Sequence, residues 1–158
     1  MSLILGRVTF GDQKNKRNVL SRQEAVDLLN DWVKNDRLQL HMKQVAALMH
    51  AWAIEKENLQ EAEAWHWELA GLLHDADWDQ WPEQHCKKII EELESRHIDP
   101  EIIHAIASHG HTHFGVVPKT KMDKILKEIS DPQKRVVFEG KGMAAGVKAY
   151  AQLSTATG

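Results

Sequence analysis

Apolar residues recur along most of the chain at intervals of three and four positions, the period expected of amphipathic α-helices. No stretch alternates apolar and polar residues as a half-buried strand does. The pattern predicts helices over residues 21–34, 37–57, 61–75, 83–96, 99–110 and 120–130. The predicted fold class is therefore all-α, a single compact helical domain of about six helices.

Helix-start signals support three of these boundaries. Ser21 followed by Glu24 has the spacing of a capping box, in which each side chain satisfies a backbone N–H of the first turn. Asp99 before Pro100 combines an N-cap residue with proline at the first helical position. Thr120 is a suitable N-cap for the last predicted helix.

The two ends of the chain are patterned differently from the middle. Residues 1–20 carry little periodic apolar character, which favours an N-terminal arm. After position 130 the chain holds several glycines, each of which costs a helix about 1 kcal/mol relative to alanine. We therefore expect an arm over residues 1–20, a helical domain over 21–130 and a C-terminal tail over 131–158.

Composition and charge exclude several classes of protein. The formal net charge of −3 argues against a general nucleic-acid coat. No apolar run approaches the roughly 18 residues of a membrane span, and the first residues lack the pattern of a signal peptide. The single cysteine, Cys86, favours a reducing compartment. We expect a cytoplasmic protein with neither a membrane nor a nucleic acid as partner, and the oligomeric state is not encoded in any pattern.

The chemistry is indicated by histidine, of which the chain has ten. His41 follows the apolar face of the second predicted helix, and His74-Asp75 ends the third. His85 falls in the first turn of the fourth helix, and His109 on the inner face of the fifth. Burying several imidazoles without partners costs about 1–3 kcal/mol per unsatisfied group. A shared metal ion removes that cost, so the convergence favours metal binding.

Each of these residues also has a simpler interpretation. A lone inward histidine is more often a hydrogen-bonded core residue than a ligand, and a His-Asp dipeptide is common. His111 and His113, in the loop after His109, fit ligands, substrate contacts or loop polarity equally well. Trp78 and Trp81, in a loop expected over residues 77–82, either wall a pocket or pin the loop to the domain. The remaining histidines are interpreted as ordinary helix residues: His50, His66, His97 and His104.

Several short strings resemble the HD-domain superfamily, which comprises all-helical metal-dependent phosphohydrolases. The resemblance is to its small, single-domain bacterial branch and covers roughly residues 21 to 130. The strings that carry it are Val33-Lys34-Asn35, His41-Met42, Ala70-Gly71-Leu72-Leu73-His74-Asp75-Ala76-Asp77, Pro82-Glu83-Gln84-His85 and Ala105-Ile106-Ala107-Ser108-His109. Leu-Leu-His-Asp at a helix end is fairly specific when a histidine precedes it in an earlier helix.

The resemblance implies a set of metal ligands. In that family the first histidine, the His-Asp pair and a later aspartate bind one metal ion, and two further histidines bind a second ion in binuclear members. Carried over, His41, His74 and Asp75 match the first set, whereas His85 and His109 match the second. Asp75, if it bridges the two ions, would be the central catalytic residue.

The chain departs from the family at the last ligand. Aligning residues 121–126 with the family's last helix places Ser130 where an aspartate is usual, with Asp131 one position later. A shift of one residue on a helix is about 100°, so Asp131 reaches the metal only if the helix unwinds before Pro132. Three outcomes therefore remain open at this point: full ligation by the protein, five protein ligands completed by water, and weakened activity.

Three functions fit these residues. The resemblance implies a phosphomonoester or phosphodiester hydrolase that acts on a small nucleotide-like or other phosphorylated metabolite, using one or two divalent ions among Mn, Fe, Ni, Zn and Mg. A diiron oxygenase, similar to inositol oxygenase, fits the same ligands. A non-enzymatic helical module is the third hypothesis. Lys119, Lys121 and Lys124 either attract a phosphate or form a solvated helix face.

Overall fold

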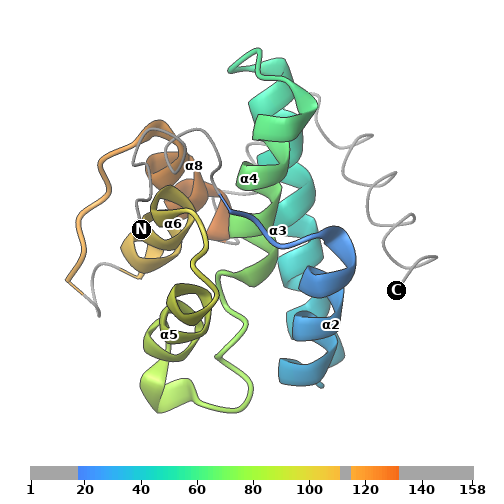
Figure 1. Ribbon diagram of the computed structural model, residues 1–158, viewed down its shortest axis with the longest axis vertical. Coiled ribbons are helices and arrows are strands. Elements are labelled where there is room, and N and C mark those ends of the chain that lie inside the picture. Colours follow the sequence, from blue (N-terminus) through green and yellow to red (C-terminus); the bar gives the residue numbers. More distant parts are fainter. Residues whose placement is uncertain (1–17, 111–114, 132–158) are drawn as a thin grey trace, which may run out of the picture.

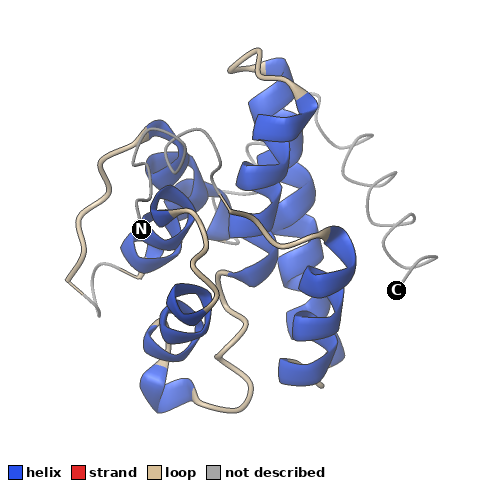
Figure 2. Cartoon of the chain, viewed as in Figure 1, coloured by secondary structure: helices blue, strands red, loops and turns tan. Residues whose placement is uncertain are grey.

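The computed structural model of the protein describes residues 18–110 and 115–131 (Figure 1). These residues form six α-helices and one short 3-10 turn, and no strand occurs among them (Figure 2). The all-α prediction is confirmed. None of the helices in these two ranges is long and apolar enough to cross a membrane. Residues 1–17 of the predicted arm and 132–158 of the predicted tail lie outside the described residues.

A central pair of helices organises the domain. Figure 1 shows α3 and α4 side by side, with α2 on one side and α6 and α8 on the other, while α5 packs against α6. This arrangement brings elements from distant parts of the chain to the end of α4. The elements are α2 (Arg22–Trp32), α3 (Asp36–Glu55), α4 (Glu61–Leu73), η1 (Pro82–Gln84), α5 (Lys87–Ser95), α6 (Pro100–His109) and α8 (Lys121–Ser130).

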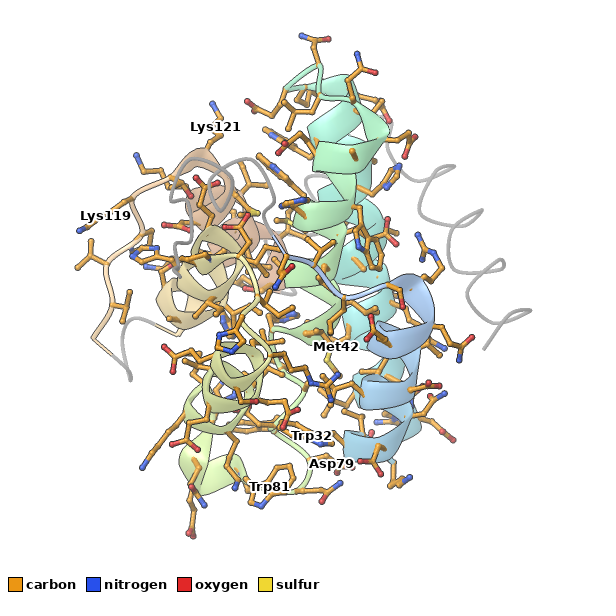
Figure 3. The ribbon with its side chains drawn as sticks, in the orientation of Figure 1. Trp32, Met42, Asp79, Trp81, Lys119 and Lys121 are labelled. Carbon is orange, nitrogen blue, oxygen red and sulfur yellow. The ribbon has the colours of Figure 1, made fainter. Side chains whose placement is uncertain are left out.

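Small residues let α3 and α4 approach closely. A Cβ atom added at Gly71 would lie 2.9 Å from the Cα atom of Ala46 and 3.0 Å from its backbone nitrogen. Met42, on the same helix as Ala46, is fully buried between the helices (Figure 3). The close approach also bears on the position of His74, because Gly71 lies three residues before it.

Substituting Gly71 tests this packing. Gly71→Ala gains about 1 kcal/mol of helix propensity, but its methyl group meets backbone atoms, and overpacking of this kind costs about 1–3 kcal/mol. We expect a net destabilisation of up to about 2 kcal/mol, measured as a lower urea midpoint with an unchanged slope. A raised midpoint would show that α3 and α4 separate freely.

The three helix starts predicted from capping signals are observed. The Ser21 backbone N–H donates to Glu24 Oε1 at 2.8 Å, and the Glu24 N–H donates to Ser21 Oγ at 3.1 Å, which completes the capping box of α2. Asp99 Oδ1 accepts the N–H of Glu101 at 3.0 Å and begins α6. A second capping box begins at Thr120, the N-cap of α8.

The fourth predicted helix is wrong at its start. The chain forms η1 at Pro82–Gln84, then breaks at His85 and Cys86 before α5 begins at Lys87. Cys86 has φ 74°, a left-handed conformation that a helix cannot continue through. His85 therefore precedes the helix instead of lying in its first turn. The periodicity of residues 83–96 did not reveal this break because no glycine or proline marks it.

The loop after α4 is anchored to the end of α2 and the junction between α2 and α3. The rings of Trp81 and Trp32 meet edge to face with centroids 4.8 Å apart. Asp79 Oδ2 accepts the backbone N–H groups of Lys34 at 2.8 Å and Asn35 at 3.2 Å. Figure 3 shows Trp32, Asp79 and Trp81 together at one end of the molecule. These contacts pin the loop that delivers His85.

A buried carboxylate joins α2, α3 and α4. Glu68 is fully buried, with Oε2 2.8 Å from Arg22 Nη1 and Oε1 2.8 Å from His50 Nδ1. The hydrogen bond to Glu68 raises the pKa of His50 above 6.5, against the opposing effect of burial. His50 was predicted to be an ordinary helix residue, and the structure gives it this specific partner.

The raised pKa of His50 predicts a pH-dependent contribution to stability. A group with a raised folded-state pKa stabilises the protein fully below its unfolded-state pKa, about 6.5, and loses that contribution as pH rises through the folded-state pKa. We expect the difference in unfolding free energy between the wild type and His50→Gln, measured in chelator, to be largest below pH 6 and to shrink above pH 7. A pH-independent difference would contradict this.

Candidate metal centre

Five side chains from four parts of the fold meet at the end of α4. His41 comes from α3, His74 is the C-cap of α4 and Asp75 follows it, His85 lies between η1 and α5, and His109 is the last residue of α6. Asp75 lies among the four imidazoles. Its Oδ2 atom is 3.3 Å from both His41 Nε2 and His74 Nε2, and its Oδ1 atom is 3.2 Å from His85 Nε2 and 3.1 Å from His109 Nε2.

The structure thus brings together all five residues predicted as metal ligands. The four imidazole rings are also in contact with one another. Centroids are 5.1 Å apart for His41 and His74, 4.8 Å for His74 and His109, and 5.3 Å for His85 and His109, all in edge-to-face arrangements. His74 is fully buried, and Asp75 keeps one fifth of its side chain exposed. The four histidines therefore form one cluster and are not separate buried residues of the core.

The spacing of these donor atoms suits a metal ion. Ligand atoms held about 2.1 Å from a common ion lie roughly 3.0 Å apart at octahedral angles and 3.4 Å apart at tetrahedral ones. The distance between His41 Nε2 and His74 Nε2 is 3.2 Å, and the nitrogen to carboxylate distances are 3.1 to 3.3 Å. The side chains therefore need little movement to coordinate.

Hydrogen counting gives a second test of fit. In three of the imidazoles both ring nitrogens face acceptors, because Nδ1 lies 2.6 Å from Gly71 O in His74, 2.8 Å from Asp77 Oδ1 in His85 and 2.5 Å from Ile106 O in His109. A neutral imidazole carries a single ring hydrogen. With that hydrogen donated from Nδ1, Nε2 presents a lone pair to the centre, and its contact with Asp75 requires either a second proton or a metal ion.

The pKa shifts disfavour a second proton on His74 and favour one on His85 in the metal-free protein. Burial lowers the pKa of His74, more than the attraction of Asp75 raises it, so a second proton on His74 is disfavoured. Burial opposes ionisation of Asp75, but His74, His109 and His41 together hold its pKa well below 3.8. Burial also opposes the charge on His85, yet hydrogen bonds to Asp75, Asp77 and Cys86 raise its pKa to about 12. A metal ion at His85 therefore displaces a proton.

The described residues form two groupings that could hold a metal ion. One is His41, His74 and Asp75, and the other is His85, Cys86 and His109. Each grouping has its donor atoms within 4.8 Å of one another. The separation into two groups matches the two ligand sets that the resemblance implies, apart from Cys86. Asp75 contacts histidines of both groupings, so the donor set fits one ion or two.

Sequence reasoning missed two residues of the site. Asp77, fully buried, accepts from His85 Nδ1 and from the backbone N–H of Ile89 at 3.0 Å, so it orients the imidazole and begins α5. Its place two residues after Asp75 was a usable signal. Cys86 was taken only as an indicator of redox compartment, although it is adjacent to His85 in the chain.

The last family ligand has no counterpart in these groupings. Ser130 ends α8, where its hydroxyl donates to Lys127 O at 3.2 Å. Asp131 is the C-cap with φ −79° and ψ 116°, so the helix does unwind there, but neither grouping of the described donors includes it. His111 and His113 lie outside the described residues.

Two other histidines predicted as ordinary residues contact carboxylates away from the centre. His104 Nδ1 lies 2.7 Å from Asp123 Oδ2, and His66 Nδ1 lies 3.3 Å from Asp99 Oδ2. His97 is exposed. These contacts support the simpler interpretation of the three residues.

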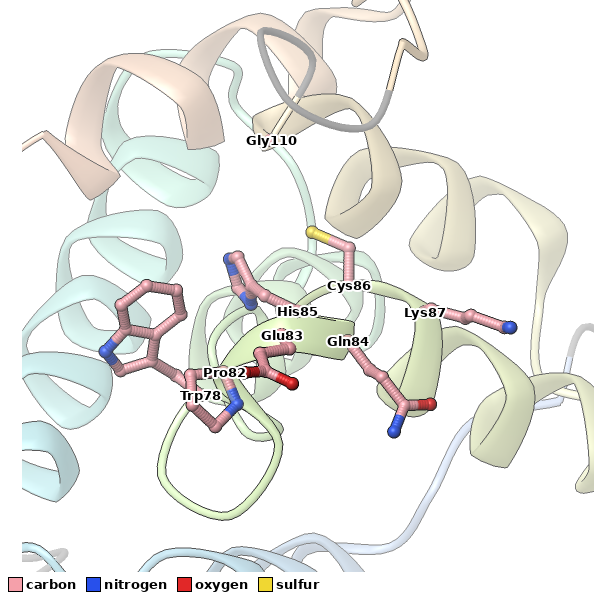
Figure 4. Close-up of a pocket in the computed structure, with 8 residues that line it drawn as sticks. All are labelled: Trp78, Pro82, Glu83, Gln84, His85, Cys86, Lys87 and Gly110. Carbon is pink, nitrogen blue, oxygen red and sulfur yellow. The ribbon is translucent and has the colours of Figure 1, made fainter.

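A pocket opens beside the cluster (Figure 4). It has a volume of about 520 Å³ and reaches the cluster through His85. Trp78 is 49% exposed and its ring meets that of His85 edge to face, with centroids 5.0 Å apart. Trp78 therefore walls the pocket, whereas Trp81 pins the loop. The lining consists of Trp78, Pro82, Glu83, Gln84, His85, Cys86, Lys87 and Gly110.

Searches of the chain against family models, curated proteins and solved structures found no match.

Asp77 offers a test of how the imidazole of His85 is held. The Asp77 carboxylate accepts hydrogen bonds from the His85 ring and from the Ile89 backbone. In Asp77→Asn one oxygen remains for these two donors and the side-chain NH₂ group faces one of them, so the His85 ring loses its fixed orientation. We expect binding of the ion at His85 to weaken by about 10-fold to 100-fold, with the ion at His41 and His74 retained. Calorimetric metal titration measures both steps, and circular dichroism checks the helices. Equal weakening of both steps would indicate a general loss of structure.

Proposed function

We propose that the protein is a metal-dependent phosphohydrolase of the HD-domain type, acting on a small phosphorylated metabolite. The observation that carries the proposal is the position of Asp75, with one carboxylate oxygen toward His41 and His74 and the other toward His85 and His109. A carboxylate shared in this way between two imidazole pairs is suited to bridging two ions. The His-Asp string at the end of α4 adds support from the sequence.

Different residues of the chain would have different roles in this function. His41, His74, His85 and His109 hold divalent ions through Nε2, and Asp75 supplies the shared negative charge. Such ions act as Lewis acids and lower the pKa of bound water from about 15.7 toward 7, which supplies a nucleophile at neutral pH. Buried Asp77 keeps the His85 imidazole fixed, which limits the reorganisation needed during reaction.

The pocket beside His85 is the proposed place for the substrate. Trp78 offers an apolar wall for a base or other ring, and exposed Lys87 lies among the lining residues as a cation for a phosphate. The other basic residues are less suited to this role. Lys121 pairs with Glu57 at 3.8 Å, and Figure 3 shows Lys119 and Lys121 at the end of the molecule away from Trp81. Lys121 fits a solvated helix face, and exposed Lys119 lies in the loop before α8.

Elemental analysis of protein purified without added metal, followed by a phosphatase screen with the metal found, tests the proposal. Stoichiometric Mn, Ni, Zn, Mg or Fe together with phosphate release from a nucleotide or sugar phosphate is the expected result. Two irons with dioxygen consumption and no phosphate release would favour the diiron oxygenase. Metal-free protein without turnover, even after metal is added, would leave the non-enzymatic module.

A further inference from the structure

Cys86 lies within a cluster of four possible donors on one side of the centre. The donor atoms of Cys86, His85 and His109 are within 4.8 Å of one another, and Asp75 Oδ1 is within 3.2 Å of both imidazoles. Cys86 is 1% exposed, so its thiol, which lies beside the two imidazoles, is shielded from solvent. The thiol is therefore a member of the cluster and not an isolated core residue.

The backbone directs this thiol toward the imidazoles. Neighbouring side chains in extended chain point to opposite sides, but the left-handed φ of 74° at Cys86 turns its side chain to the same side as His85 (Figure 4). Such a conformation is costly for a residue other than glycine. Gly110 makes room, because a Cβ atom there would lie 2.9 Å from Cys86 Sγ.

The thiol has a weak alternative partner. Its contact with the carbonyl oxygen of Ile106 is 4.0 Å long, and that oxygen already accepts from His109 Nδ1 at 2.5 Å. The Cys86 sulfur and the His109 imidazole thus both contact the carbonyl oxygen of Ile106 in the last turn of α6. Among the described residues, the donor atoms grouped with the sulfur are those of His85 and His109 in the centre.

We propose that Cys86 is a metal ligand, so that His85, Cys86, His109 and Asp75 form a site of two nitrogens, one sulfur and one oxygen for a thiophilic divalent ion such as Zn²⁺ or Co²⁺. The inference rests on the proposed metal centre and specifies the ion of its second grouping. With bonds of about 2.0–2.3 Å, the donors need to close by roughly 1 Å around the ion. Coordination releases the thiol proton to the buffer and leaves the oxidation state of sulfur unchanged.

The two groupings then differ in the metals they favour. His41 and His74 with Asp75 Oδ2 offer only nitrogen and oxygen, which suit Mn²⁺ or Fe²⁺ as well as Zn²⁺. A thiolate shifts preference toward Zn²⁺, Co²⁺ and softer ions. The structure therefore predicts a centre whose two positions discriminate between metals, a property that a set of histidines and carboxylates alone does not provide.

Titration of the full chain with Co²⁺ tests the proposal through absorbance. A thiolate ligand produces an intense near-ultraviolet sulfur-to-cobalt charge-transfer band, which we expect in the wild type and in His41→Ala but not in Cys86→Ser. Competition against a chromophoric chelator should show that Cys86→Ser lowers Zn²⁺ affinity at least about 10-fold and leaves Mn²⁺ affinity within about twofold. Circular dichroism of the metal-free variants controls for folding.

The outcomes separate this inference from the proposed function. Cobalt binding without the band overturns the role of Cys86 and leaves the phosphohydrolase proposal intact. The band in a protein that hydrolyses no phosphate ester supports Cys86 as ligand and counts against the hydrolase. Absence of any metal binding overturns both. A band that persists in Cys86→Ser also overturns the inference.

Discussion

Asp75→Asn should abolish both metal loading and turnover. Loss of a residue that only orients a ligand costs about 10-fold to 100-fold in metal affinity, and Asp75 contacts all four imidazoles directly. The amide also puts two N–H donors where a carboxylate oxygen stood, so it hydrogen-bonds to the imidazole lone pairs that an ion needs. We therefore expect metal affinity and phosphatase turnover to fall by more than about 100-fold.

Asp27→Asn is the matched control for this variant. Asp27 is exposed on α2, where its Oδ1 atom accepts from Gln23 Nε2 at 2.8 Å, so the same change of charge occurs away from the centre. Metal content by elemental analysis and phosphate release should both remain at the wild-type level in Asp27→Asn. If Asp75→Asn still binds stoichiometric metal and turns over, Asp75 is not the bridging group.

The predictable part of the fold is local. Ser21, Asp99 and Thr120 were identified as helix starts because capping needs only side chains within three residues of the first turn. The break at Cys86 was missed because the room for its side chain comes from Gly110, which is distant in the sequence, so no local pattern marks the left-handed backbone. Local propensity therefore placed five of the six helix starts and failed beside the candidate site.

The candidate site was predictable to the same extent. His41, His74 and His109 follow apolar helix faces, so periodicity alone points them inward, and α3, α4 and α6 bring them together. The supporting atoms were not predictable in this way. Asp77 holds the ring of His85 through a hydrogen bond, and the side chain of Cys86 points toward the imidazoles. Both positions depend on the path of an irregular loop.

Ser130 is where the chain departs from the resemblance, and an aspartate placed there should strengthen the proposed first metal position. α8 packs against α3, α4 and α6, the three helices that carry His41, His74 and His109. Three protein donors, His41, His74 and Asp75, leave a four-coordinate ion one ligand short. We expect Ser130→Asp to increase affinity at this position by about 10-fold to 100-fold, because it adds a charged oxygen donor.

Ser130→Asn distinguishes coordination from packing, since it adds the same bulk without the charge. Asp131→Asn tests the neighbouring carboxylate, which caps α8 and belongs to neither grouping of described donors, and should leave affinity unchanged. Calorimetric titration with Mn²⁺ compares the three variants with the wild type. Ser130→Asp binding no more tightly than Ser130→Asn would place the end of α8 out of reach of the ion. Loss of affinity in Asp131→Asn would instead make Asp131 the replacement ligand, which requires the unwound end of α8 to turn toward His41.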